Sequence, residues 1–212
     1  IPMDPQKSAN QNAQFYFKKY NKAKNAVEMI GEQIKETKDE INYIESQLDN
    51  LDKCIDELEV QEIREELVKE GYIKANGRKK HAQKAVVSKP HHFISSDGFD
   101  IFIGKNNAQN DRLTLKIAAS EDIWMHAKEI PGSHVIIRTQ GRNVPDKTLS
   151  EAAMLAAYFS KGRSSSKVPV DYCLRKNVRK PSGAKPGMVI YENYNTIYVT
   201  PSEEEIRKMR KI

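Results

Sequence analysis

The chain has 212 residues, of which 38% are hydrophobic and 30% charged, so it can hold one or two globular domains. Its two cysteines are too few for a disulfide framework, and it carries neither a secretory signal peptide nor an apolar run long enough to span a membrane. We therefore expect a cytoplasmic protein. Because the chain opens on Ile1 in the middle of a pattern, we also expect it to be part of a longer protein.

Charge divides the chain into two parts. Residues 1–71 carry 10 Lys and Arg against 16 Asp and Glu, a net charge of −6. Residues 72–212 carry 25 against 13, a net charge of +12. A domain with this surplus has the electrostatic footprint of a polyanion binder, although a solvated lysine-rich surface gives the same count.

The acidic part contains a heptad repeat. From Val27 to Leu58 apolar residues occupy nine of the ten a and d positions, which predicts a long coiled-coil helix over about 13–58. The candidate N-terminal caps are Ser8, Asn10 and Asn12. Such a helix needs a partner, which is either an earlier helix of a longer protein or a second copy of this chain. A bend at 48–52 is the weaker alternative.

Three further segments complete the predicted domain organisation. A short helix is expected over about 60–70, ending near Gly71. Residues 72–90 are rich in cations and hold no acid, which predicts a mobile basic linker. A compact domain is expected over 91–212.

The patterns of that domain mix strands and helices without regular alternation. Strands are predicted at 91–96, 99–104, 122–128, 134–139, 168–174, 187–191 and 196–200, and helices at 105–120, 148–161 and 202–210. Thr148 with Glu151, and Ser202 with Glu205, have the spacing of capping boxes, and Gly162 is a predicted helix stop. We expect an α+β fold with a mainly antiparallel sheet.

The stretch from Asp122 to Thr139 holds two apolar runs with period-two alternation around a predicted type II turn at Pro131-Gly132. In these strands Ile123, Met125, Ala127, Val135 and Ile137 face one way, and Trp124, His126, Lys128, His134 and Arg138 face the other. The second set is suited to stacking on bases and contacting phosphates. The alternative is a structural tryptophan with two hydrogen-bonded histidines.

The register of this strand pair stays open in the sequence. A two-residue loop pairs His126 with Ile137, and an extra residue or a bulge places it beside Arg138 or Ile136. Only the bulged pairing gathers the aromatic, imidazole and cationic side chains on one surface.

Two loops concentrate cations. KGRSSSK covers 161–167, and RKNVRKPSGAKPG, which covers 175–187, holds five cations. Clusters of this kind follow a phosphate backbone well.

Catalytic signatures are absent from the sequence. No GxxxxGK[ST], GxGxxG, HExxH or GxSxG motif occurs, and the histidines lack metal-ligand spacing. We expect no enzyme, no catalytic residue, no metal and no cofactor.

Five stretches resemble the NFACT family. SSDGFDIFIGKNNAQNDRLT, DIWMHAKEIPGSHVII, SEAAMLAAYFSKGRSSSKVPVDY and KNVRKPSGAKPGMVIYEN are similar, in order, to its C-terminal RNA-binding domain. NAQFYFKKYNKAKNA, over 12–26, resembles the second helix of the family's coiled-coil middle region. In the family this helix pairs with an earlier one.

The resemblance implies a bacterial ribosome-quality-control factor that binds tRNA and the obstructed large ribosomal subunit and supports C-terminal alanine tailing. The family name fibronectin-binding protein implies an alternative, a surface adhesin without a signal peptide whose partner is fibronectin. The combined candidate RNA-binding residues are Lys105, Asn107, Arg112, Trp124, His126, Lys128, His134, Arg138, Lys161, Arg163, Lys167, Arg175, Lys176, Arg179, Lys180 and Lys185.

Overall fold

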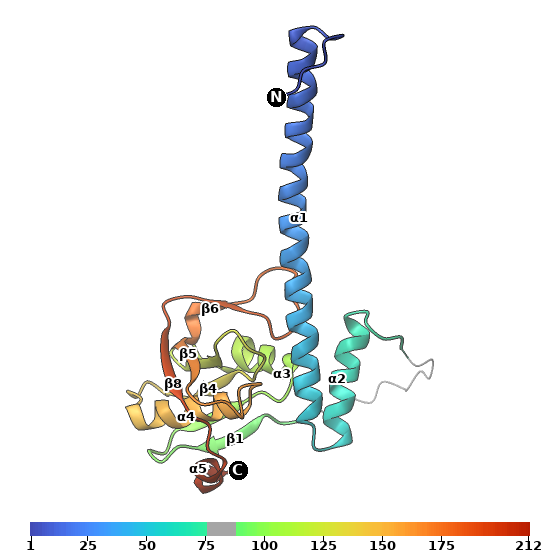
Figure 1. Cartoon of the computed structure of the whole chain (residues 1–212). Helices are drawn as coiled ribbons and strands as arrows, with labels where there is room; N and C mark the ends of the chain where they lie inside the picture. Colours follow the sequence, from blue (N-terminus) through green and yellow to red (C-terminus); the bar gives the residue numbers. More distant parts are fainter. Residues whose placement is uncertain (76–87) are drawn as a thin grey trace. The chain divides into compact units, whose positions relative to one another are not determined.

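The computed structural model describes residues 1–75 and 88–212 and contains two compact units, 1–42 and 43–212. Most of the expected basic linker, residues 76–87, lies outside the described residues. Helix α1 (Ala9–Asp52) supplies nearly all of the first unit and the first residues of the second (Figure 1). Within the described residues no helix combines the length and apolarity needed to cross a bilayer.

Helix α1 begins four residues before its expected start. The Ser8 hydroxyl accepts a hydrogen bond from the Gln11 backbone N–H at 3.3 Å, and the Gln11 side chain accepts from the Ser8 N–H at 2.9 Å. This reciprocal pair satisfies two backbone donors that the first turn of a helix leaves unpaired. Of the candidate caps, Ser8 therefore forms the cap.

The predicted a and d side chains of the first unit face solvent. Val27 is 70% exposed, and Ile34 and Ile41 are about half exposed. The heptad therefore leaves an apolar seam along the helix that no described residue covers.

Helix α1 ends at Asp52, so the expected continuation to residue 58 was wrong. Helix α2 (Glu57–Lys69) starts in the place of that continuation because Asp56 accepts a hydrogen bond from the Glu59 N–H at 2.9 Å. Asp56 takes an extended conformation typical of an N-cap, which interrupts the helical path although the apolar heptad continues through it.

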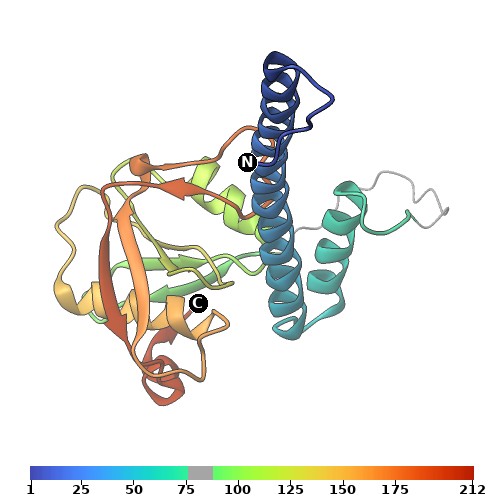
Figure 2. The ribbon, with the colours of Figure 1, turned by 45° about the horizontal axis from the view of Figure 1, so that its top comes forward.

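The second unit is built on a seven-stranded antiparallel sheet with the strand order β8-β5-β3-β4-β2-β1-β9 (Figures 1 and 2). Its strands are β1 (His91–Ile94), β2 (Asp100–Ile103), β3 (Ile123–Ala127), β4 (Val135–Ile137), β5 (Val168–Leu174), β8 (Asn195–Val199) and β9 (Arg210–Lys211). The short strands β6 (Val178–Arg179) and β7 (Ile190–Tyr191) form a separate antiparallel pair. The expected α+β fold is confirmed.

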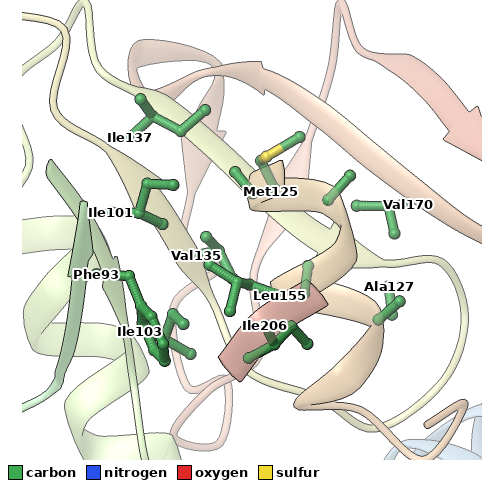
Figure 3. Close-up of a cluster of buried hydrophobic side chains, with 14 of the residues drawn as sticks. Phe93, Ile101, Ile103, Met125, Ala127, Val135, Ile137, Leu155, Val170 and Ile206 are labelled. Atoms are coloured by element: carbon green, nitrogen blue, oxygen red, sulfur yellow. The ribbon is translucent and has the colours of Figure 1, made fainter. Parts of the chain in front are cut away.

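One face of the sheet packs on helix α4 (Asp146–Tyr158). The alanines of α4 and Leu155 are fully buried against the strands, and Figure 3 shows Leu155 in one cluster with Val135 and other strand residues. Small alanine side chains let the helix backbone approach the sheet closely. Helix α5 (Glu203–Lys208) adds Ile206 to this core, and its start is capped by Ser202, which accepts from the Glu205 N–H at 3.3 Å as predicted.

The other face of the sheet carries a second, smaller core. It is covered by helix α3 (Asn107–Arg112), the π-helical turn η1 (Leu113–Ile117) and the β6-β7 pair, which a 3-10 turn η2 (Arg175–Asn177) precedes. Its buried residues are Leu113, Trp124, Ile136, Cys173 and Val178. The period-two alternation of the two central strands is confirmed, because their odd-numbered and even-numbered residues enter different cores.

The Thr148–Glu151 capping box does not form, because both side chains bind the β1-β2 turn instead. The Thr148 hydroxyl contacts Ser95 Oγ at 2.9 Å and Asp97 Oδ2 at 2.8 Å. Glu151 accepts a hydrogen bond from the Ser96 N–H at 2.9 Å. Helix α4 begins two residues before Thr148. The Thr148 and Glu151 side chains therefore join α4 to the β1-β2 turn and do not cap the helix.

The connection between β3 and β4 differs from the predicted type II turn. Gly132 does not take a positive φ, and the left-handed residue is Glu129 with φ 56°. Gly132 instead forms an isolated antiparallel bridge with Ser160. A residue in a β-bridge cannot also be helical, so the bridge at Ser160 ends α4 before Gly162. The last residue of α4 is Tyr158.

The pairing of β3 with β4 places Trp124 opposite Ile136. Continued by two residues, this register brings His126 beside His134, and their ring centroids are 5.4 Å apart. The three pairings considered for His126, with Ile137, Arg138 or Ile136, were therefore all wrong. The longer connection through Gly132 sets this register.

Candidate nucleic-acid interface

The aromatic centre of the sheet is buried. Trp124 has no exposed surface and His134 is 1% exposed. The indole stacks on His126 at 5.9 Å between ring centroids and meets His134 edge-on at 5.2 Å and Tyr191 at 4.8 Å. Trp124, His126 and His134 are thus gathered on one face, but the part of the face where they lie is beneath the β6-β7 pair and α3. Trp124 and His134 do not reach the surface.

Burial also decides the charge of the two histidines. Loss of solvent lowers the pKa of His126 to about 4 and the pKa of His134 well below its usual value. His134 Nδ1 lies 2.8 Å from the Thr114 hydroxyl, a contact that suits a neutral ring. Both imidazoles are therefore uncharged at neutral pH and give no cation to a phosphate.

Seven of the candidate cations are paired with acids that are distant in the sequence. The N–O distances are 2.5 Å for Lys105–Glu59, 2.5 Å for Lys180–Asp111, 3.1 Å for Lys185–Glu70, 3.2 Å for Lys161–Glu45, 3.2 Å for Lys176–Glu121, 3.5 Å for Arg163–Glu203 and 3.6 Å for Lys128–Asp171. The more exposed of these pairs are weak and can exchange their acid for a phosphate. Lys105 and Lys128 pair with buried acids, Glu59 and Asp171, so the fold holds their ammonium groups in place.

Three further candidates have structural contacts. Arg175 donates to the carbonyl oxygens of Thr114 at 2.6 Å and Leu115 at 3.0 Å, which satisfies carbonyls at the end of the π-helical turn. Asn107 is buried and donates to Ser46 Oγ at 2.7 Å. The guanidinium of Arg138 lies 5.1 Å from the centre of the Phe102 ring.

Arg112, Lys167 and Arg179 are exposed, and their side chains make no ion pair or hydrogen bond within the described ranges. Arg112 ends α3, and Arg179 ends β6. The segment that carries Arg112 contacts the segment that carries Arg179. Lys180 binds Asp111, and Arg175 binds the turn after Arg112.

We call the exposed cations of these two segments the basic ridge: Arg112, Lys116, Lys176 and Arg179. Only Lys176 among them has an acid partner in the described structure, Glu121, and that pair is exposed. Long cationic side chains on two adjacent segments, with solvent on one side, can bind successive phosphates of a polyanion.

Sequence reasoning missed two exposed aromatic residues. Tyr194 is 44% exposed and Tyr198 is 68% exposed. The signal for them was the alternation in YNTIYV, in which every second residue from Tyr194 avoids the apolar face. In the described part of the chain no three metal-binding side chains come together.

The chain is similar to known protein families. A family model for the NFACT N-terminal and middle domains matches residues 1–85, and one for the NFACT protein RNA binding domain matches residues 89–193. The Rqc2 homolog RqcH of Bacillus subtilis is 44% identical over all of this chain and 37% of its own length. Ribosome quality control complex subunit 2 of Saccharomyces cerevisiae is 36% identical over 43% of this chain and 9% of its own length.

A solved structure is also similar. It is the C-terminal part of the fibronectin/fibrinogen-binding protein from Streptococcus suis, with a TM-score of 0.84 and 45% identity over 96% of this chain and 80% of that one. The chain spans little more than a third of the length of the RqcH relatives that it matches, 37% to 38%. Two family models in sequence order, and a solved relative matched over four fifths of its length, show that this chain belongs to the NFACT family.

Proposed function

We propose that the chain is the RNA-binding C-terminal part of a cytoplasmic ribosome-quality-control factor. In this role it binds tRNA and the obstructed large ribosomal subunit and supports C-terminal alanine tailing of stalled nascent chains. Support comes from the RNA-binding family model over residues 89–193 and from the names of the RqcH and yeast relatives. Peptide-bond chemistry belongs to the ribosome in this proposal, so the chain binds and positions RNA.

The observation that carries the proposal is the basic ridge. The segments that carry its cations are held by internal hydrogen bonds and an ion pair. Little conformational entropy of these segments is therefore lost when RNA binds. Phosphate contacts made by such residues give affinity that depends strongly on salt and weakly on sequence.

The test is RNA binding by the 212-residue chain with Arg112→Ala and Arg179→Ala combined. We expect weaker tRNA binding at low salt and a salt slope flatter by up to about two units, because two phosphate contacts are lost. Titrations at about 50 and about 200 mM salt measure both quantities. The matched control is Lys147→Ala with Lys208→Ala, which removes the same charge from helices α4 and α5.

Equal losses in the two double variants would mean that net charge, and not the basic ridge, governs binding. Binding that does not respond to salt would remove the proposal of phosphate recognition altogether.

A second candidate is adhesion to fibronectin at the bacterial cell surface. It is favoured by the name of the Streptococcus suis protein whose C-terminal structure is similar. Competition of tRNA against fibronectin for the labelled chain separates the two functions. Displacement by fibronectin alone would favour the adhesin.

A further inference from the structure

Two tyrosines stand on the outer face of the sheet edge. Strand β8 pairs with β5 so that Tyr198 lies opposite Pro169 and Thr196 opposite Asp171. The alternate residues Ile197 and Val199 pack into the core beneath α4. Thr196 and Tyr198 therefore face away from α4, and β8 is an edge strand, as Figure 2 shows.

A buried carboxylate holds this surface in place. Asp171 has no exposed area and accepts hydrogen bonds from the Thr196 hydroxyl at 2.5 Å and the Tyr191 hydroxyl at 2.8 Å. The Tyr191 ring in turn meets Tyr194 edge-on at 5.2 Å between centroids. The side chains beneath and beside Tyr194 are thus fixed before any ligand arrives, which lowers the entropy lost on binding.

Cations flank the two rings. Lys128 Nζ, which pairs with buried Asp171 at 3.6 Å and is partly exposed, lies 5.1 Å from the centre of the Tyr194 ring. The Lys167 N–H donates to the Thr200 hydroxyl at 3.2 Å, which places Lys167 beside the end of β8 beyond Tyr198, and its side chain is exposed. Exposed aromatic rings between cations are the combination that binds single-stranded nucleic acids, because bases stack on the rings while phosphates meet the cations.

We propose that Tyr194, Tyr198, Lys128 and Lys167 form a tyrosine platform that stacks the unpaired bases of a single-stranded RNA segment. Tyr194 directly precedes β8, and at about 3.4 Å per residue of extended chain the two tyrosines are roughly 14 Å apart, so they hold separate bases of one segment. A duplex cannot use this platform, since its bases already stack on one another. The inference deepens the proposed RNA binding and rests on it, but it uses a different surface from the basic ridge.

The test compares Tyr198→Ala with the unchanged 212-residue chain on two RNAs. One is an unstructured RNA of about eight nucleotides carrying 2-aminopurine, and the other is a hairpin without unpaired overhangs. We expect Tyr198→Ala to weaken binding of the unpaired RNA by roughly 5- to 100-fold and to remove quenching of the 2-aminopurine fluorescence. Hairpin binding should stay unchanged.

Two controls make the result specific. Tyr198→Phe keeps the aromatic face and should retain binding and quenching, whereas a purely polar contact would be lost in it. Tyr20→Ala removes a tyrosine that is 62% exposed on α1 and should change neither RNA. Circular dichroism of each variant verifies that the chain is folded.

Equal losses on both RNAs, or none on either, would overturn the platform. In the second case the free edge of β8 would be left for another ligand, such as an added peptide strand. The combined Arg112→Ala and Arg179→Ala variant should weaken binding of both RNAs. Failure of the basic ridge would appear as unchanged binding in that variant, whereas failure of the platform would appear as equal or absent losses in Tyr198→Ala.

Discussion

At the scale of single residues, Trp124 changes from a candidate RNA contact to a structural residue. Its indole is enclosed by two imidazoles and Tyr191, and no acceptor lies within hydrogen-bond distance of its Nε1 in the described structure. A buried N–H without a partner costs free energy, so the ring contributes to stability through its contacts and not through its donor.

We expect Trp124→Ala to lower the free energy of unfolding by about 3–5 kcal/mol, because it leaves a cavity in the second core. Trp124→Phe should cost less, since it keeps an aromatic ring against His126 and removes the unpartnered N–H. Urea unfolding of both variants measures these values. RNA affinity measured where the protein is folded should match that of the unchanged chain, and a selective loss of RNA binding without loss of stability would restore Trp124 as a contact.

At the scale of elements, helix α2 is joined to the domain by carboxylates on one face. Four glutamates contact residues far along the chain: Glu59 binds Lys105, Glu62 binds Ser88 and Asn106, Glu66 binds Tyr43 and the Ala108 N–H, and Glu70 binds Lys185. Burial raises the pKa of Glu66, so this face is held by a desolvated acid as well as by partly buried ion pairs. The acidic helix and the basic domain therefore belong to one compact unit.

We expect Glu62→Ala to destabilise the chain by about 1–3 kcal/mol, because the Ser88 N–H and the Asn106 side chain lose their acceptor. Glu65→Ala, on the exposed side of the same helix, is the matched control and should cost about 0.5 kcal/mol or less. Urea denaturation midpoints provide the comparison. Equal losses in the two variants would show that the loss of a negative charge on α2, and not the interface, sets the effect, because alanine is the better helix former.

The elements themselves were largely predictable, and their contacts were not. The alternation of apolar residues in β3 and β4 is local, so the sequence reports which side chain enters which core. The register depends on Gly132 reaching Ser160, a contact across the fold that no local pattern contains. Thr148 fails as a cap for the same reason, since Ser95 and Asp97 bind its hydroxyl.

The candidate interface shows the same limit. Cation clusters are visible in the sequence, but whether each lysine is free depends on acids that the fold brings to it, as Glu59 is brought to Lys105. Tyr198 was missed because an exposed aromatic residue and a core aromatic residue look alike until the sheet edge is known.

At the scale of the whole molecule, the apolar seam of α1 is exposed, and no described residue covers it. Val27, Ile30, Ile34 and Ile41, four of the five a and d residues from 27 to 41, are each at least half exposed. Water contact along such a seam is unfavourable, and knobs-into-holes packing against another helix removes it. The proposed partner is a second copy of this chain, or an earlier helix where a longer chain supplies one.

We expect the 212-residue chain to self-associate through this seam, because it brings no other helix that covers the a and d positions in the described structure. Sedimentation equilibrium should give an apparent mass that rises with concentration toward that of a dimer. Ile34→Lys should shift the chain to monomer, because dimerisation would bury a charge at an a position. Asn25→Lys places the same charge at an f position, away from the seam, and should leave association unchanged. A chain that stays monomeric at high concentration while α1 remains fully helical would contradict pairing, and it would mean that a single helix tolerates this seam in water.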